Sequence, residues 1–212
     1  MRVRCAEYAQ VEMTPEELPE GEIAVLGLAK SGMSVSRLLL SRGRRVYASD
    51  SAASPTATDN AEKLKSLGAD ATAGAHDIDR IRQASLVVAS PGIPPEVAPL
   101  VAAREARVPI VGEVEIALRF LPDARIIAVT GTNGKTTTTA LVGHLLRALG
   151  LDAVDAGNIG TPLSEMALRE KPPEWIALEM SSFQLHDTPS ISNHTKPHLL
   201  PPAHADRGTP YR

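Results

Sequence analysis

Cysteine and aromatic residues are scarce in this sequence, and long apolar runs are missing. The single cysteine, Cys5, excludes an intramolecular disulfide and favours a reducing compartment. Aromatic side chains make up only 3% of the residues, which argues against stacking platforms for single-stranded nucleic acid. No apolar run approaches the ~18 residues of a membrane span, and the N-terminus lacks the apolar core of an export signal. We therefore expect a cytoplasmic protein with no membrane insertion.

Neither sign of charge dominates the composition. The 22 basic and 25 acidic residues give a formal net charge of −3, whereas a general nucleic-acid binder is usually basic. We therefore expect no nucleic-acid partner. The content of 43% hydrophobic and 22% charged residues is ordinary for a globular protein. At roughly 150 residues per domain, 212 residues correspond to one large domain or two small ones.

Short apolar strands alternate with helical segments along most of the chain, a pattern that predicts βαβ units and parallel sheets. The alternation restarts after Leu121–Asp123, which we interpret as a domain boundary. In the first half we expect a loop over residues 51–60 and only four strands, near residues 23–26, 44–50, 84–90 and 108–112. The predicted organisation is a polar leader, a Rossmann-like domain, a partial P-loop ATPase-type domain and an irregular tail, over residues 1–20, 21–121, 122–188 and 189–212.

The strongest motif follows the predicted strand near residue 129. A glycine-rich turn leads into a helix, so backbone N–H groups and the helix N-terminus are expected to surround a polyphosphate. By the usual roles in such a loop, Lys135 reaches the β- and γ-phosphates and the Thr136 hydroxyl binds Mg²⁺. The loop is a variant, because Val129 stands where the first glycine is usual. The predicted nucleotide-binding residues are Gly131, Thr132, Asn133, Gly134, Lys135, Thr136 and Thr137.

A second glycine-rich turn, GLAKSG at residues 27–32, follows the first predicted strand. It is similar to a dinucleotide fingerprint, but Ala29 stands at the middle glycine, which weakens a reading as an NAD site. The segment is equally compatible with a tight turn that has no ligand. Asp50 and the SPGI segment at residues 90–93 end two further strands at the same expected edge, where open α/β sheets bind ligands.

A third group of polar residues follows the last predicted strand. Glu179 ends that strand and is placed to hold Mg²⁺ beside the phosphate loop. Asn158 taken alone is a turn residue, and His144 is expected to be structural because it points along its helix away from the loop. The histidines of the tail have no fixed ligand spacing, so we predict no metal site there.

Together these motifs resemble the Mur ligases, the ATP-dependent amino-acid ligases of peptidoglycan synthesis. The similarity runs from Ile23 to about Ser190, and AGNIGTPL and LEMSSFQL are similar to the members that add D-glutamate. The resemblance implies binding of UDP-N-acetylmuramoyl-L-alanine by Ala29, Lys30, Ser31, Asp50, Ser90, Gly92 and Ile93. It further implies ATP and Mg²⁺ at Lys135 and Thr136, a metal ligand in Glu179, and muramoyl contacts from Asn158 and Gln184.

The reaction implied by the resemblance is activation of a carboxylate. ATP phosphorylates the carboxylate of the UDP-linked substrate, and the amine of D-glutamate displaces the phosphate. The family has a third domain that closes over the nucleotide, and the chain ends before it, so we expect an incomplete and inactive portion of a monomeric ligase. His204 faintly matches a histidine of the family. Two alternatives stay open: a non-catalytic nucleotide-binding scaffold, and an unrelated P-loop NTPase behind an NAD-type domain.

Overall fold

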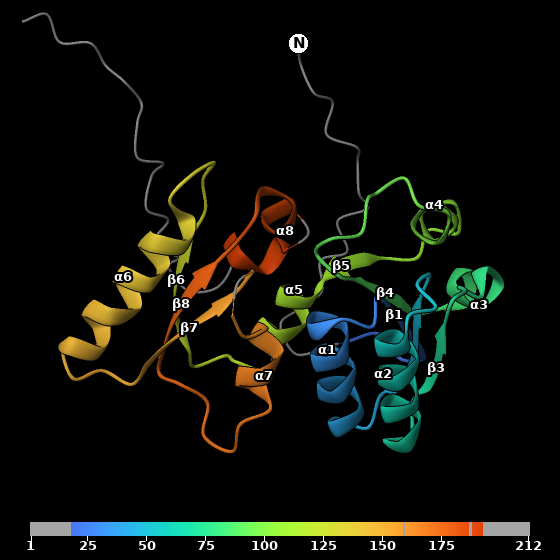
Figure 1. Cartoon of the computed structure of the whole chain (residues 1–212), viewed down its shortest axis with the longest axis horizontal. Coiled ribbons are helices and arrows are strands. Elements are labelled where there is room, and N and C mark those ends of the chain that lie inside the picture. The colour runs from blue at the N-terminus through green and yellow to red at the C-terminus, as the bar shows by residue number, and fades with distance from the viewer. Residues whose placement is uncertain (1–17, 159, 187, 193–212) are drawn as a thin grey trace, which may run out of the picture.

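The computed structural model describes residues 18–158, 160–186 and 188–192. Within them the chain forms two parallel β-sheets covered by helices (Figure 1), which confirms the predicted α/β class. Most of the predicted leader, with Cys5, lies outside the described residues, as does most of the predicted tail, with His204. No helix of the described part is both long enough and apolar enough to cross a membrane.

The first sheet has five parallel strands in the order β3-β2-β1-β4-β5. The central strand β1 is flanked on both sides, and its residues Ile23 to Leu26 are fully buried. Because every connection is a crossover between parallel strands, all the carboxyl ends meet at one edge of the sheet. The strands are β1 (Glu22–Leu26), β2 (Arg45–Asp50), β3 (Asp70–Ala73), β4 (Leu86–Ala89) and β5 (Ile110–Gly112).

Helices cover both faces of this sheet, as the alternation of buried side chains requires. Ile23 and Val25 of β1 belong to the cluster that includes side chains of α1 (Lys30–Ser41) and α2 (Pro55–Ser66). Ala24 and Leu26 face the opposite way, toward α3 (Ile78–Gln83) and α4 (Ala98–Glu105). The strand is therefore apolar throughout because it is buried on both sides.

The sequence reading of this half was wrong in three places. It missed β3, whose four residues are small and only partly buried, and it missed α3. It assigned residues 51–60 to a loop, but α2 begins at Pro55, with the Ser54 hydroxyl accepting a hydrogen bond from the N–H of Ala57. Serine at the N-cap followed by proline at the first helical position is a helix-start signal, and the small polar residues after it concealed the first half of the helix.

The second sheet has three parallel strands in the order β6-β8-β7. These strands are β6 (Arg125–Val129), β8 (Trp175–Glu179) and β7 (Ala153–Gly157). The long helix α6 (Lys135–Ala148) packs on this sheet and forms the outer side of the molecule in Figure 1. Shorter helices complete this half: α7 (Leu163–Ala167), α8 (Ser182–His186) and the 3₁₀ turn η1 (Pro189–Ser192).

A further unpredicted helix, α5 (Glu113–Arg119), lies between the two sheets (Figure 1), and every one of its residues is buried. It packs against α1 on one side and against α7 and η1 on the other. The main apolar cluster is continuous across it, from Val25 in the first sheet to Leu178 in the second. The two sheets are therefore joined through a shared core and not through an exposed linker.

Candidate functional site

The turn after β1 brings a helix N-terminus to the edge of the first sheet. Gly27 has φ +96°, a conformation that glycine adopts without steric cost. A Cβ on Gly32 would overlap the carbonyl oxygen of Gly27, so helix and strand approach as closely as they do only because of this glycine. The N-cap residue Ala29 supplies no side-chain hydrogen bond, which leaves the first turn of α1 uncapped by a side chain. Such an N-terminus favours an anion.

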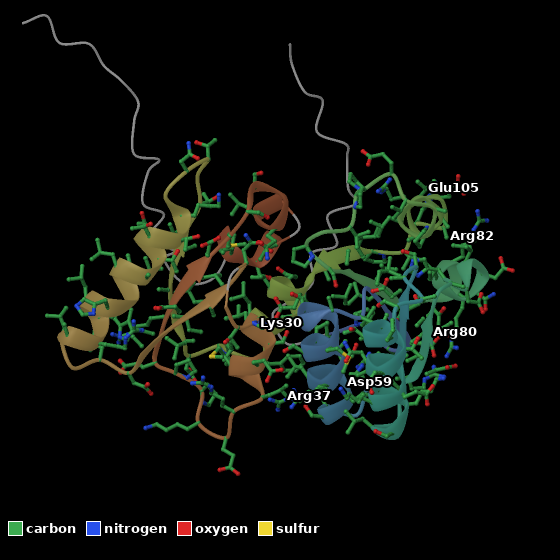
Figure 2. The ribbon with its side chains drawn as sticks, in the orientation of Figure 1. Lys30, Arg37, Asp59, Arg80, Arg82 and Glu105 are labelled. Atoms are coloured by element: carbon green, nitrogen blue, oxygen red, sulfur yellow. The ribbon has the colours of Figure 1, made fainter. Side chains whose placement is uncertain are left out.

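The predicted substrate residues on this turn are accessible. Ala29 and Lys30 are exposed and Ser31 is partly buried. In Figure 2, Lys30 is labelled at the end of α1 that lies beside α5. The structure thus places all three at the first turn of α1 on the carboxyl edge of the sheet.

Asp50, at the end of β2, ties two backbone segments together. Its Oδ2 accepts a hydrogen bond of 2.8 Å from the N–H of Leu28, and its Oδ1 accepts one of 2.8 Å from the N–H of Ala52. The carboxylate therefore shapes the turn that leads into α1. The predicted ribose or base contact would use its remaining lone pairs and stays a prediction.

Two residues at this edge were missed by the sequence reading. Asn60 of α2 donates a 2.8 Å hydrogen bond from Nδ2 to the carbonyl oxygen of Leu28. His76, after β3, lies with Nδ1 2.9 Å from Oγ of Ser49. Burial lowers the pKa of His76, and the nearby Asp50 charge opposes that shift. Asn60 lies in the part of α2 that was predicted to be a loop, and His76 follows β3, which was not predicted.

The SPGI segment forms the third part of the edge, after β4. Ser90 donates its N–H to the carbonyl oxygen of Leu26, and its own carbonyl accepts from the N–H of Ile93 at 3.1 Å. The Oγ of Ser90 is buried and has no hydrogen-bond partner among the described residues. Gly92 is exposed. The structure therefore brings the predicted residues of the three strand ends to one edge, as expected from the parallel order.

The glycine-rich loop of the second sheet joins β6 to α6, as predicted. Gly134 is the N-cap of α6 and has φ +75°, so the turn needs a left-handed residue at that position. Lys135 is the first residue of the helix, and its Nζ donates a 2.9 Å hydrogen bond to the carbonyl oxygen of Gly131. Most of the predicted nucleotide-binding side chains are solvent-accessible: Thr132, Asn133, Thr136 and Thr137.

Glu179 lies beside the start of this loop. It ends the central strand β8 and pairs in register with Val129 on one side and Gly157 on the other. The residue is only 2% exposed, and its Oε1 accepts a 3.2 Å hydrogen bond from Nδ2 of Asn158. Its Oε2 is buried with no partner among the described residues. A buried, half-satisfied carboxylate calls for another partner, because leaving such a group unpaired is costly.

These groups fit Mg²⁺. The described residues contain no cluster of three or more His, Cys, Asp or Glu side chains that could hold a metal ion alone. Magnesium rarely needs one, since it usually binds through one or two carboxylates, waters and the phosphates of a nucleotide. The free Oε2 of Glu179 and the Thr136 hydroxyl are oxygen donors of the right kind. The structure thus brings Asn158, Glu179 and the loop together.

Gln184 makes a local pair of hydrogen bonds at the start of α8. Its side-chain Oε1 accepts a 3.0 Å hydrogen bond from the N–H of Ser181, while its own N–H donates to the Ser181 hydroxyl at 3.2 Å. This reciprocal pair is a capping box at the start of α8. Gln184 is 5% exposed, so a contact with a muramoyl group stays a prediction. His144 is exposed in the interior of α6, and no described contact ties it to the loop.

The fold and its Gly-Lys-Thr loop define an α/β protein with a glycine-rich loop between a parallel strand and a helix. Two sequence families match the chain: "Mur ligase MurD-like, N-terminal domain" over residues 21–112 and "Mur ligase middle domain" over residues 129–200. The chain belongs to the Mur ligase family.

Relatives point to one branch of that family. The UDP-N-acetylmuramoylalanine–D-glutamate ligase of Desulfatibacillum aliphaticivorans is 41% identical over 176 residues, which is 83% of this chain and 39% of that relative. The ligase of the same name from Frankia casuarinae is 43% identical over 80% of this chain and 36% of its own length. The chain therefore spans less than two-fifths of these relatives. Among solved structures, UDP-N-acetylmuramate-alanine ligase from Thermotoga maritima is 28% identical with a TM-score of 0.43, over 76% of this chain and 37% of that chain.

Proposed function

We propose that this chain carries the UDP-substrate site and the ATP site of a ligase that joins D-glutamate to UDP-N-acetylmuramoyl-L-alanine. The observation that carries the proposal is the pairing of the Gly131–Thr137 loop with the buried, half-satisfied Glu179 on the neighbouring strand. The names and the identity of the relatives supply the substrates. We assign the UDP-linked substrate to residues 21–121 and ATP to residues 122–188.

At the first sheet, the pyrophosphate of the UDP-linked substrate is assigned to the first turn of α1. The N–H groups of residues 30 and 31 and the Lys30 ammonium would supply donors and positive charge there. The uridine side is assigned to the other predicted residues of the same edge, which are Asp50, Ser90, Gly92 and Ile93. The muramoyl end would then extend toward Asn158 and Gln184.

At the second sheet, the described residues bind and orient the nucleotide. The backbone of the Gly131–Thr137 loop would surround the β- and γ-phosphates, and Lys135 would exchange its bond to the Gly131 carbonyl for a phosphate oxygen. Magnesium held by Glu179 and Thr136 would neutralise charge on the transferring phosphoryl group. Asn158 holds Glu179 in place through Oε1, which leaves Oε2 for the metal.

The chemistry needs little covalent work from the protein. The carboxylate of the UDP-linked substrate attacks the γ-phosphorus of ATP, ADP leaves, and an acyl phosphate forms. The amine of D-glutamate then attacks the acyl carbon, releases inorganic phosphate and loses a proton as the amide forms. Alignment and electrostatic stabilisation carry such a reaction.

Calorimetric titration of the 212-residue chain with Mg-ATP and, separately, with UDP-N-acetylmuramoyl-L-alanine tests the proposal. We expect both ligands to bind, and Lys135→Ala to weaken only ATP. Displacement of the UDP-linked ligand by NAD, or the absence of any ATP binding, would refute the assignment. Release of ADP that depends on D-glutamate would extend the proposal from binding to turnover by this chain.

A further inference from the structure

Glu113 is a buried carboxylate for which the proposed reaction has no use. It is the first residue of α5 and is 2% exposed. Its Oε1 accepts a 2.6 Å hydrogen bond from the backbone N–H of Ser164, which lies in the first turn of α7. The bond joins residues 51 positions apart in the chain and links the helix that follows the last strand of the first sheet to the second half of the molecule.

Helix α7 follows directly from the loop that carries Asn158. The N–H of Gly157 donates to the carbonyl oxygen of Thr161 at 3.0 Å, which closes this loop on itself just before α7. At its other end, the N–H of Asn158 donates to the carbonyl oxygen of Glu179 at 2.9 Å. The position of α7 therefore limits where the Asn158 side chain can lie relative to Glu179.

The same short helix also contacts α1, whose N-terminus forms the candidate substrate edge. Arg37 of α1 makes a 2.9 Å ion pair with Glu165 of α7, and Arg37 is labelled beside α7 in Figure 2. Arg42, at the end of α1, lies with Nη2 3.4 Å from the carbonyl oxygen of Ala167. These two contacts are partly exposed to solvent, where each contributes little. The bond from Ser164 to Glu113 is the buried one.

Two other acidic residues lie near Glu113, and each of them pairs with an arginine. Glu115, on the same helix, is fully buried and pairs with Arg119 at 2.7 Å, and it also accepts hydrogen bonds from the N–H and hydroxyl of Ser190. Glu165 pairs with Arg37 and adds a repulsive charge near Glu113. Burial raises the pKa of Glu113, and the hydrogen bond from Ser164 opposes that shift.

We propose that Glu113 is a positioning residue: by holding Ser164 it fixes α7, and with it the Asn158 loop, against α5, the helix that follows the last strand of the substrate-binding sheet. The inference rests on the proposed function for its consequence, because a displaced Asn158 would release Glu179 from the geometry that leaves Oε2 free for Mg²⁺. The hydrogen bond and the burial that fix α7 are properties of the fold alone.

Three single substitutions separate the parts of this inference. Glu113→Gln keeps the shape and a carbonyl acceptor for Ser164 but cannot ionise. Glu113→Ala leaves the buried N–H of Ser164 without its acceptor. Glu165→Gln is the matched control, since it removes an acid from the same interface at a more exposed position.

Amide hydrogen exchange of the ligand-free chain measures directly how firmly α7 is held in place. In Glu113→Ala we expect amide exchange in residues 160–168 to be faster by roughly tenfold or more, as an unsatisfied buried donor implies, while β1 and β2 are unchanged. Glu113→Gln and Glu165→Gln should each stay close to the parent. Equal exchange in Glu113→Ala and the parent would overturn the proposal.

The pH profile distinguishes a titrating carboxylate from a merely structural side chain. Because the folded-state pKa of Glu113 is raised, its stabilising contribution is full below the ordinary pKa of glutamate and is lost as pH rises through the raised value. As pH rises above the ordinary pKa of glutamate, the parent should therefore lose stability relative to Glu113→Gln. This comparison holds even if Glu113→Ala does not fold, and identical pH profiles of the parent and Glu113→Gln would contradict the proposal.

Binding of Mg-ATP then tests the consequence for the site. We expect weaker binding in Glu113→Ala and parent-like binding in Glu113→Gln at low pH. If the parent itself binds no Mg-ATP, the proposed function fails while the exchange data still decide the role of Glu113. If the parent binds and Glu113→Ala binds equally well, the positioning role fails and the proposed function stands.

Discussion

The Nζ of Lys135 donates a 2.9 Å hydrogen bond to the carbonyl oxygen of Gly131, the first glycine of its own loop. The lysine therefore folds back across the turn that it terminates. In the proposed ATP complex a phosphate oxygen would replace this neutral acceptor, and a hydrogen bond between two charged groups is the stronger of the two. The lysine thus already bonds across its own loop, and the proposed ligand would offer it a stronger acceptor.

Replacing Lys135 with alanine should weaken binding of ATP by roughly tenfold to a hundredfold, because a contact to a charged group contributes about 1.5–3 kcal/mol. Calorimetric titration measures the change. Lys171→Ala is the matched control, since that lysine is exposed in a turn and is not part of the loop. Equal affinities of Lys135→Ala and the parent would show that the lysine does not contact the nucleotide.

Replacing Glu179 with glutamine should remove most of the dependence of ATP binding on Mg²⁺. The amide keeps a carbonyl oxygen but loses the negative charge that a divalent cation requires. We expect the gain in affinity that Mg²⁺ gives the parent to fall by at least about tenfold, a loss seen even when groups behind a metal ligand are removed. Titrations with and without Mg²⁺ measure this, and an unchanged magnesium effect would remove Glu179 from the metal site.

Much of the fold could be predicted from local sequence because its strands are buried on both faces. Ile23–Leu26 and Trp175–Glu179 read as short apolar runs, and glycine-rich turns follow the strands that precede α1 and α6. The parallel order then brings GLAKSG, Asp50 and SPGI to one edge without further information. Two short elements were missed, since β3 and α3 have four and six residues and little apolar content.

The parts of the site that depend on tertiary contacts could not be predicted. Glu113 and Glu115 are charged residues that lie fully inside the protein, and their partners Ser164 and Ser190 are distant in sequence. No local sequence pattern predicts hydrogen bonds between residues so far apart in the chain. The capping box of Ser181 and Gln184 is different, because the spacing of these two residues is a signal that the sequence does contain.

Two glycines in helices should respond differently to the same substitution by alanine. At Gly32 the added Cβ would overlap the backbone carbonyl of Gly27, which cannot move without shifting the turn. At Gly143 it would overlap the carboxylate of Asp155, whose side chain can rotate at the expense of its pair with Arg147. Alanine gains roughly 0.5–1 kcal/mol of helix propensity in both cases.

We therefore expect Gly143→Ala to be close to neutral, and Gly32→Ala to cost about 1–3 kcal/mol, as overpacking typically does. Chemical denaturation of the two variants and the parent measures the difference. Because the overlap at Gly32 lies under the first turn of α1, that variant should also bind the UDP-linked substrate more weakly. Equal stabilities of the two variants would mean that the turn at Gly27 is more adaptable than the structure indicates.

His76 provides a test of the charges at the substrate edge. Burial lowers the pKa of this histidine and the Asp50 carboxylate opposes the shift, so replacing Asp50 with asparagine should lower the pKa further. With a folded-state pKa below the ordinary value, the stabilising contribution of neutral His76 is present above that value and is lost as pH falls through the lowered one. An NMR titration of the imidazole in the parent and in Asp50→Asn measures both values. A pKa in Asp50→Asn that is equal to or higher than the parent's would show that the carboxylate does not act on the ring, and that Ser49 alone holds His76 at the edge.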